Sequence, residues 1–155
     1  MKHSVLFVCL GNICRSPLAE AAFRLEAERM GLDVEIDSAG TADWHVGRPP
    51  DPRAQAVAAK NGAEISHMRA RQVIAEDFRR FRHIVALDSK NLANLRALQP
   101  ADGTAELSLL LDHAPGRGGE AVADPDYGED AVFEVTWRHV NEGARALASR
   151  LAQQA

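Results

Sequence analysis

One junction near the start of the chain constrains its fold more than any other stretch, because an apolar run, a short loop and a helix start follow one another there. Residues 5–8 are short, apolar and rich in β-forming side chains, which is typical of a fully buried strand. Ser16 and Pro17 suit the N-cap and the first position of a helix. We therefore expect residues 9–15 to form the turn between the strand and the helix.

This turn has the properties of an anion site. A loop that leads into the first turn of a helix points backbone N–H groups at one spot, and the helix dipole adds partial positive charge there. Arg15, at the end of the loop, contributes a planar fork of donors that can hold two phosphate oxygens. Cys9 lies at the other end, where the same field stabilises a thiolate. The junction thus predicts a phosphate site that contains its own nucleophile, Cys9.

The spacing of these residues is specific, since five residues separate Cys9 from Arg15 and Ser16 follows directly. Further blocks with turn and helix-start chemistry occur in a fixed order at residues 37–41, 43–54, 70–73 and 124–128. Together these blocks resemble the low-molecular-weight protein tyrosine phosphatases, and the resemblance covers essentially the whole chain.

Composition and charge narrow the class of protein. A chain of 155 residues that is 46% hydrophobic suits one globular domain, residues 1–155, with a single core. The net charge of −4 argues against nucleic acid as a partner. We expect no membrane insertion and a cytoplasmic location, because no long apolar run or leader is evident. Two cysteines make neither a disulfide framework nor a metal site, so we expect reduced thiols and no metal.

Strand-like and helix-like patterns alternate along the rest of the chain. Strands are expected at residues 5–8, 34–37, 83–87 and 107–111, and helices after residues 15, 51, 75, 88 and 132. This alternation predicts the α/β class: a small doubly wound three-layer sandwich with a four-stranded parallel sheet. The family resemblance implies the strand order 2-1-3-4 and a phosphate-binding loop after the first strand.

The first helix carries an apolar stripe that should face the core. Its members are Leu18, Ala21, Ala22 and Leu25. The charged residues between them are expected to face away from the core, and these are Glu20, Arg24, Glu26 and Glu28.

The resemblance implies a role for each residue of the loop. Cys9 would attack phosphorus to give a cysteinyl-phosphate, while Arg15 and the loop amides hold the phosphate oxygens. The loop residues expected to bind the substrate are Leu10, Gly11, Asn12, Ile13, Cys14 and Ser16. The Ser16 hydroxyl can hydrogen-bond to the thiolate, although a simple N-cap role would also explain this residue. This chemistry requires no metal and no organic cofactor.

The loop has no carboxylate, so the proton for the leaving group must come from elsewhere. Asp124 matches the general acid of the family, and Pro125 favours an extended backbone there; from sequence physics alone Asp124 is more simply a turn residue. Trp44 and Tyr127 match positions that flank the substrate slot of the family, whose depth would favour phosphotyrosine over phosphoserine. Asp126 stands where the family commonly has an aromatic residue and would place negative charge at the slot mouth.

Two residues outside the loop are expected to support it. Ser38 and His67 correspond, with Asn12, to the polar network that holds the loop of the family in shape. The family's histidine usually stands directly before the basic residue of the block that ends Ala70-Arg71. This chain has Met68 at that position and His67 one place earlier.

Two other functions fit parts of the pattern. An arsenate reductase on the same fold would need further cysteines downstream, and none follows Cys14. A non-catalytic phosphotyrosine-binding or redox-sensing module is disfavoured by the complete set of Cys9, Arg15 and Asp124. We therefore predict hydrolysis of phosphotyrosine in proteins or peptides and of small aryl phosphates, with inorganic phosphate as product and inhibitor.

Overall fold

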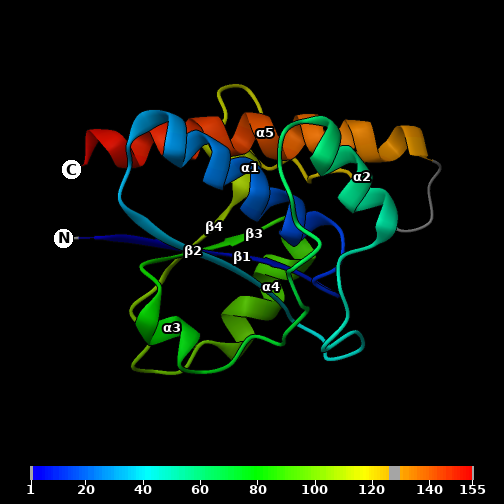
Figure 1. Ribbon diagram of the computed structural model, residues 1–155. Helices are drawn as coiled ribbons and strands as arrows, with labels where there is room; N and C mark the ends of the chain where they lie inside the picture. Colours follow the sequence, from blue (N-terminus) through cyan, green and yellow to red (C-terminus); the bar gives the residue numbers. More distant parts are fainter. Residues whose placement is uncertain (1, 126–129, 155) are drawn as a thin grey trace.

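The computed structural model describes residues 2–125 and 130–154. One parallel sheet has the order β2-β1-β3-β4, with β1 (His3–Cys9), β2 (Val34–Gly40), β3 (His83–Ala86) and β4 (Glu106–Leu109). The helices are α1 (Arg15–Met30), α2 (Pro52–Lys60), α3 (Asp77–Arg80), α4 (Ser89–Leu98) and α5 (Asp130–Gln153). Three layers result, because α1, α2 and α5 cover one face of the sheet and α3 and α4 cover the other (Figure 1). The predicted fold class and strand order are confirmed.

Strand β1 is buried along its whole length because both faces of the sheet are covered. Val5 and Phe7 pack into the apolar cluster beneath α1, α2 and α5, and the Phe7 ring meets the Phe23 ring edge to face at 5.5 Å. Leu6 and Val8 pack into the second cluster, beneath α3 and α4. This continuous apolar run, typical of parallel strands, fixes Cys9 at the carboxyl end of the central strand.

From β1 the chain passes to β2 on one side, and from β2 it returns to β3 on the other side of β1. Ligands of open α/β sheets bind where the strand order reverses in this way. The loop after β1 is tied there to the segment after β2. The amide of Thr41 donates to Cys9 O (2.9 Å) and the amide of Asp51 donates to Ile13 O (2.8 Å). Asp51 also caps α2 as expected, since its side chain accepts from Arg53 N.

At their carboxyl ends, β2 and β4 differ from the expected strands by more than one residue, whereas β1 and β3 differ there by one. Strand β2 runs on to Gly40 because it pairs with β1 as far as Cys9. Strand β4 ends at Leu109, and the 3-10 helix η1 (Leu110–His113) follows. The reason is packing, because Leu110 is buried in the apolar cluster under α5. It lies so close to Gly143 of α5 that a Cβ on residue 143 would come within 2.5 Å of Leu110 Cγ.

The expectation for the charged residues of α1 is wrong in part. Glu20 and Glu26 are buried, with 5% and 8% of their surfaces exposed. Helix α1 packs against β1 and β2 and also against α5 beside it, so the face expected to be solvent-exposed is partly covered. The buried carboxylates are paired: Glu20 bonds to Arg24, and Glu26 bonds to Arg29.

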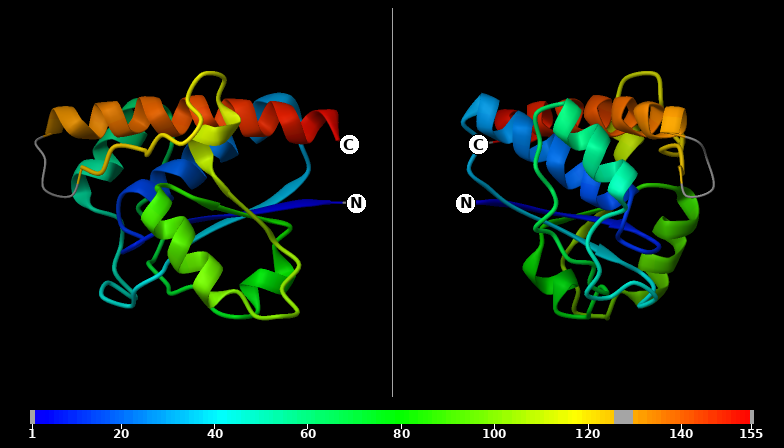
Figure 2. Two further views of the ribbon diagram at one scale, coloured as in Figure 1. Left: turned by 180° about the vertical axis from the view of Figure 1, so that it is seen from behind. Right: turned by 45° about the vertical axis from the view of Figure 1, so that its right-hand side comes forward.

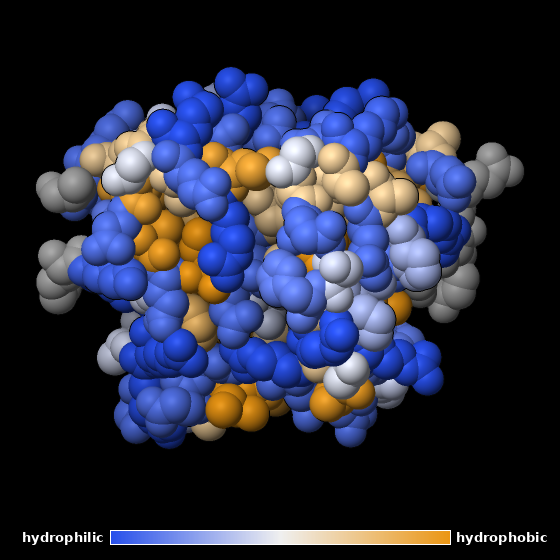
Figure 3. All heavy atoms as spheres, in the orientation of Figure 1, coloured by the Kyte–Doolittle hydropathy of each residue, from blue (hydrophilic) through white to orange (hydrophobic). Residues whose placement is uncertain are grey.

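The segment that leads to residue 125 runs beside α5, as the two views in Figure 2 show. On the face drawn in Figure 3, apolar side chains lie in separate patches among polar and charged ones. Among the residues that the structure describes, no helix is long and apolar enough to cross a membrane.

Candidate active site

Cys9 ends β1 as a buried thiol, and two donors address its sulfur. The Ser16 hydroxyl lies 3.0 Å from Cys9 Sγ, and the backbone N–H of Asn12 donates to the same atom at 3.3 Å. The expected N-cap role of Ser16 is wrong, because α1 already begins at Arg15 after an N-cap, Cys14, that makes no side-chain capping bond. The Ser16 hydroxyl therefore hydrogen-bonds to Cys9 and Asn12 instead of capping the helix.

Asn12 fixes the direction of the hydrogen bonds around the nucleophile. Its Oδ1 accepts from the backbone N–H of Arg71 (3.1 Å), which can only donate, so the amide orientation is set. Its Nδ2 then donates to Ser16 Oγ (2.7 Å) and to Ser38 Oγ (3.1 Å). Because both hydroxyls accept from Asn12, their own protons point onward, that of Ser16 toward Cys9 Sγ.

The conformation of Asn12 also suits this residue type. Its φ of 59° lies in the left-handed region, which asparagine tolerates better than most side chains do. The close neighbour beneath the loop is Gly40, where a Cβ would approach Leu10 O to 2.7 Å. Together with the hydrogen bond from Asn12 Nδ2 to Ser38 Oγ, this geometry supports the loop at the residues where support was expected.

Glu20 completes this network, and sequence reasoning missed it. The Ser38 hydroxyl donates to Glu20 Oε1 at 2.8 Å, and Arg24 bonds to Glu20 Oε2 at 2.8 Å. Burial raises the pKa of the Glu20 carboxyl above its usual value, and the bonds from Ser38 and Arg24 oppose that rise. The only sequence signal was an acidic residue next to the apolar stripe of the first helix.

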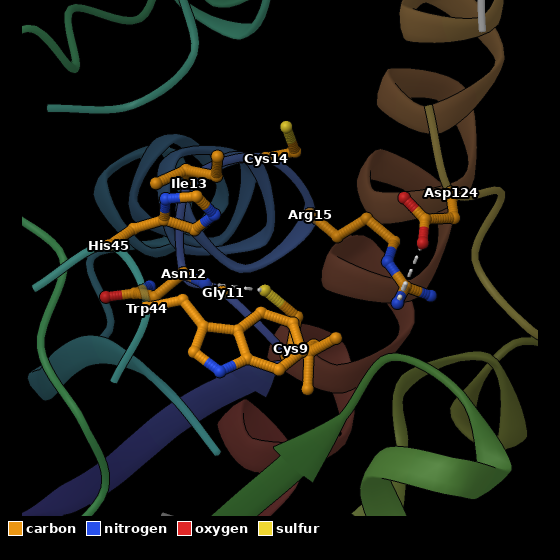
Figure 4. A pocket seen from close by; sticks show the side chains of 10 residues that line it. Cys9, Gly11, Asn12, Ile13, Cys14, Arg15, Trp44, His45 and Asp124 are labelled. Atoms are coloured by element: carbon orange, nitrogen blue, oxygen red, sulfur yellow. Dashed lines mark hydrogen bonds and ion pairs between the residues drawn. The ribbon is translucent and has the colours of Figure 1, made fainter. Parts of the chain in front are cut away.

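Arg15 is held in place by oxygens from two other parts of the chain. Its Nη1 lies 2.9 Å from Asp88 Oδ2 and donates to Val122 O at 3.2 Å. Its Nη2 lies 3.6 Å from Asp124 Oδ2, an ion pair drawn in Figure 4. The structure thus brings together the three predicted catalytic residues, Cys9, Arg15 and Asp124, around one pocket. Asp88 was predicted only as the start of a helix; its second role follows from β3 lying beside β1.

The structure does not bring His67 to the loop. His67 is exposed and lines a groove with Arg24, Leu25 and Met68, apart from the pocket that Cys9 lines. The turn in which Met68 N donates to Ile65 O directs the Met68 side chain onto the core. The expected His67 support is therefore corrected: the Asn12 network uses the Arg71 amide, Ser38 and Glu20.

The mouth of the pocket is formed by loop residues and by the segment after β2. Trp44 is 67% exposed and Leu10 is 37% exposed. His45, which sequence reasoning missed, covers Gly11 so closely that a Cβ at Gly11 would meet its Cδ2 at 2.9 Å. Figure 4 shows the Trp44 and His45 side chains on the same side of the loop. The other predicted rim residues, Asp126 and Tyr127, lie outside the described residues.

The loop offers several donors to an anion. The amides of Leu10, Gly11 and Ile13 donate to no acceptor within residues 2–125 and 130–154. With Arg15 beside them, they form a ring of N–H groups at the start of a helix. No group of three or more His, Cys, Asp or Glu side chains that could hold a metal ion occurs in the described part of the chain.

Comparisons with known proteins identify the family of this chain. The profile of the family described as "Low molecular weight phosphotyrosine protein phosphatase" matches residues 4–155. A protein of that name from Schizosaccharomyces pombe is 48% identical over 132 residues, which cover 83% of this chain and 84% of that protein.

Two solved structures show the same fold. A protein tyrosine phosphatase from Entamoeba histolytica has a TM-score of 0.92 and 30% identity, with 99% of each chain covered. A Drosophila arginine phosphatase has a TM-score of 0.89 and 31% identity, with 97% of this chain and 98% of that chain covered. From its junction loop to its last helix, this chain belongs to the low molecular weight phosphotyrosine protein phosphatase family.

Proposed function

We propose that this protein is a cysteine-dependent phosphatase that removes phosphate from phosphotyrosine in proteins or peptides and from small aryl phosphates. One observation carries the proposal: Ser16, whose oxygen accepts from Asn12, has its proton left for Cys9 Sγ at 3.0 Å. A donor aimed at the sulfur stabilises the thiolate, which is the nucleophilic form. The activity would reside in one domain, residues 1–155.

In the first half-reaction the Cys9 thiolate attacks phosphorus in line with the leaving oxygen. The S–P bond forms as the P–O bond breaks, and the Asp124 carboxyl gives its proton to the departing oxygen. The Arg15 fork and the loop amides hold the other three phosphate oxygens, on which charge is spread in the transition state. The ion pair with Asp88 holds the Arg15 guanidinium at the pocket.

In the second half-reaction a water molecule attacks the cysteinyl-phosphate. The water gives a proton to the Asp124 carboxylate, the S–P bond breaks, and the Cys9 thiolate and inorganic phosphate are released. Phosphate meets the same donors as the substrate's phosphoryl group, so it should inhibit competitively.

Substrate choice would depend on the apolar rim. Trp44, exposed at the pocket mouth, offers one wall for a phenyl ring, and Tyr127 is the residue expected to form the other. A phosphoserine is shorter, so its phosphate could reach the loop only with less contact to the rim. The carboxylate of Asp126 should favour peptides with basic residues beside the phosphotyrosine, by about 1 kcal/mol or less for an exposed pair.

The test compares three peptides of one sequence that carry phosphotyrosine, phosphoserine or phosphoarginine. We expect wild type to hydrolyse the phosphotyrosine peptide with the highest kcat/KM, and Cys9→Ser to lose at least about 10⁴-fold. Mass spectrometry of enzyme quenched during turnover should find a phosphoryl group on Cys9. Preference for phosphoarginine, or activity that survives in Cys9→Ser, would contradict the proposal.

A further inference from the structure

The two residues before Asp124 are fastened on both sides of the backbone. On the side of the sheet, the Val122 amide donates to Leu87 O at 2.9 Å, and Arg15 Nη1 donates to Val122 O at 3.2 Å. These bonds tie the segment to Leu87, directly after β3, and to Arg15, at the end of the phosphate loop. Both bonds are made by Val122, which lies two residues before Asp124.

The next residue, Ala123, is held by two side chains of α5. The Ala123 N–H donates to His139 Nδ1 at 3.1 Å. The Thr136 hydroxyl lies 2.8 Å from Ala123 O and 3.0 Å from Val132 O, so one proton is shared between two carbonyls. His139 and Thr136 are three residues apart on one helix, so they lie on the same face and reach the amide and the carbonyl of a single residue.

We propose that His139 and Thr136 are positioning residues that hold the Ala123 backbone and thereby set the place of the Asp124 carboxyl, and that protonation of His139 releases this hold. The proposal rests on the acid role proposed above for Asp124. Neither residue belongs to the pocket around Cys9, and both act through the chain segment that enters it.

The chemistry of the His139 bond makes the hold sensitive to protons. A backbone N–H can only donate, so Nδ1 must carry no proton, and the single proton of the neutral ring lies on Nε2. In the imidazolium form both ring nitrogens carry protons. The Ala123 N–H would then face another N–H, and the bond is lost.

The surroundings of His139 decide when this happens. His139 lines an open hollow with Arg117, Arg138 and Glu142, so its ring can exchange protons with solvent. Burial lowers the pKa of His139 below 6.5, the charges of Arg117 and Arg138 lower it further, and Glu120 and Glu142 act in the opposite direction. The hold is therefore complete at neutral pH and weakens in mildly acidic solution.

The experiment compares His139→Leu, which removes the acceptor, with His139→Asn, whose Oδ1 can accept at nearly the position of Nδ1 without titrating. Both are assayed from pH 5 to 8 on a phosphotyrosine peptide, a poor leaving group, and on an activated aryl phosphate. We expect His139→Leu to lose up to about tenfold in kcat on the peptide and much less on the activated ester, because one hydrogen bond is lost.

His139→Asn should approach wild type on both substrates at pH 7.5 and should lose the extra decline on the peptide that wild type shows at acidic pH. His113→Asn is the matched control, since burial also lowers the pKa of His113 but its ring bonds to Ser108 and Arg150, away from Asp124. Its peptide-to-ester ratio should follow that of wild type at every pH.

Equal losses on both substrates in His139→Leu, together with a lower Tm, would indicate a structural role and overturn the proposal. So would an Asn variant no better than Leu. If His139→Leu fails to fold, Thr136→Val removes the other bond with little change in shape and must show the same substrate dependence. Asp124→Ala separates the two proposals: if it lacks substrate dependence the acid role fails, and if only the His139 variants lack it the positioning role fails.

Discussion

The phosphate loop and the segment that carries Asp124 face the same pocket but are held in different ways. In the loop, the Arg15 side chain is 6% exposed, and the Asn12 side chain bonds to three different partners. The Asp124 side chain is 55% exposed, and its segment is held through its backbone by Arg15, Leu87 and α5. The attacking group is thus held by side chains of the loop itself, whereas the acid is placed by its backbone segment and by its ion pair with Arg15.

This difference has a consequence for catalysis. Changes to the loop alter the nucleophile and the phosphate donors, which every substrate needs. Changes to the Asp124 segment alter proton donation, which matters most for poor leaving groups. The two regions should therefore be separable by kinetics.

Among variants that keep both Cys9 and Asp124, the largest expected effect belongs to the residue that both regions share, Arg15. Arg15→Lys keeps the charge but cannot contact Asp88, Val122 and a phosphate together, because a lysine has no planar fork. We expect kcat/KM to fall about 10²- to 10³-fold on all substrates and phosphate inhibition to weaken. A loss below about tenfold would mean that the fork is not needed and that charge alone suffices.

A change confined to the loop should be smaller and should not depend on the leaving group. In Asn12→Asp both serine hydroxyls can donate to the new carboxylate, so Ser16 no longer donates to Cys9 and Ser38 no longer donates to Glu20. Loss of a hydrogen bond to a charged group should lower kcat by about 10- to 100-fold. Steady-state kinetics on an activated and an unactivated aryl phosphate measure this, and unchanged kcat values would contradict the assigned hydroxyl directions.

The rim should affect substrate binding more than turnover. Trp44→Ala removes a 67% exposed ring, so the fold should be unaffected. We expect KM for aryl phosphates to rise by about tenfold or less, in line with about 0.5–1.5 kcal/mol for an aromatic contact. An aliphatic phosphate of similar size serves as the control, because it should show no change. Equal changes for both would place Trp44 outside the substrate contact.

The smallest expected effect is on stability. Burial lowers the pKa of His83, His113 and His139. As the pH falls below the unfolded-state pKa of about 6.5, the unfolded chain takes up protons before the folded chain does. The contribution of these histidines to the free energy of unfolding is therefore fully present above that pH and decreases below it. We expect Tm to fall by about a few degrees between pH 7 and 5. The raised pKa of the single Glu20 carboxyl acts in the opposite direction. A Tm that rises over this range would contradict the pKa directions of the three histidines.

The sequence predicted what depends on local pattern. The phosphate loop is a contiguous stretch between a buried strand and a helix, so Cys9 and Arg15 could be found from this order of elements together with their spacing. Helix starts at Asp51 and Asp88 were also predictable, because capping involves neighbouring residues.

Contacts between distant residues could not be predicted in the same way. Glu20 was expected to face away from the core, yet it meets Ser38 from the neighbouring strand. The second role of Asp88, as the partner of Arg15, depends on two strands lying side by side. The expected support of the loop by His67 was wrong for a local reason. A shift of one residue in an irregular turn changes the direction of a side chain, and no periodic pattern fixes that direction.

The separation of the two regions is tested most directly by a series of aryl phosphates whose leaving groups differ in pKa. The slope of log kcat/KM against leaving-group pKa is measured for wild type, Asn12→Asp and Asp124→Ala. We predict a shallow slope for wild type, a parallel line at lower rates for Asn12→Asp, and a much steeper line for Asp124→Ala, with a loss of about 10²- to 10⁴-fold at the poorest leaving group. Parallel lines for wild type and Asp124→Ala, or a steep line for Asn12→Asp, would contradict this account.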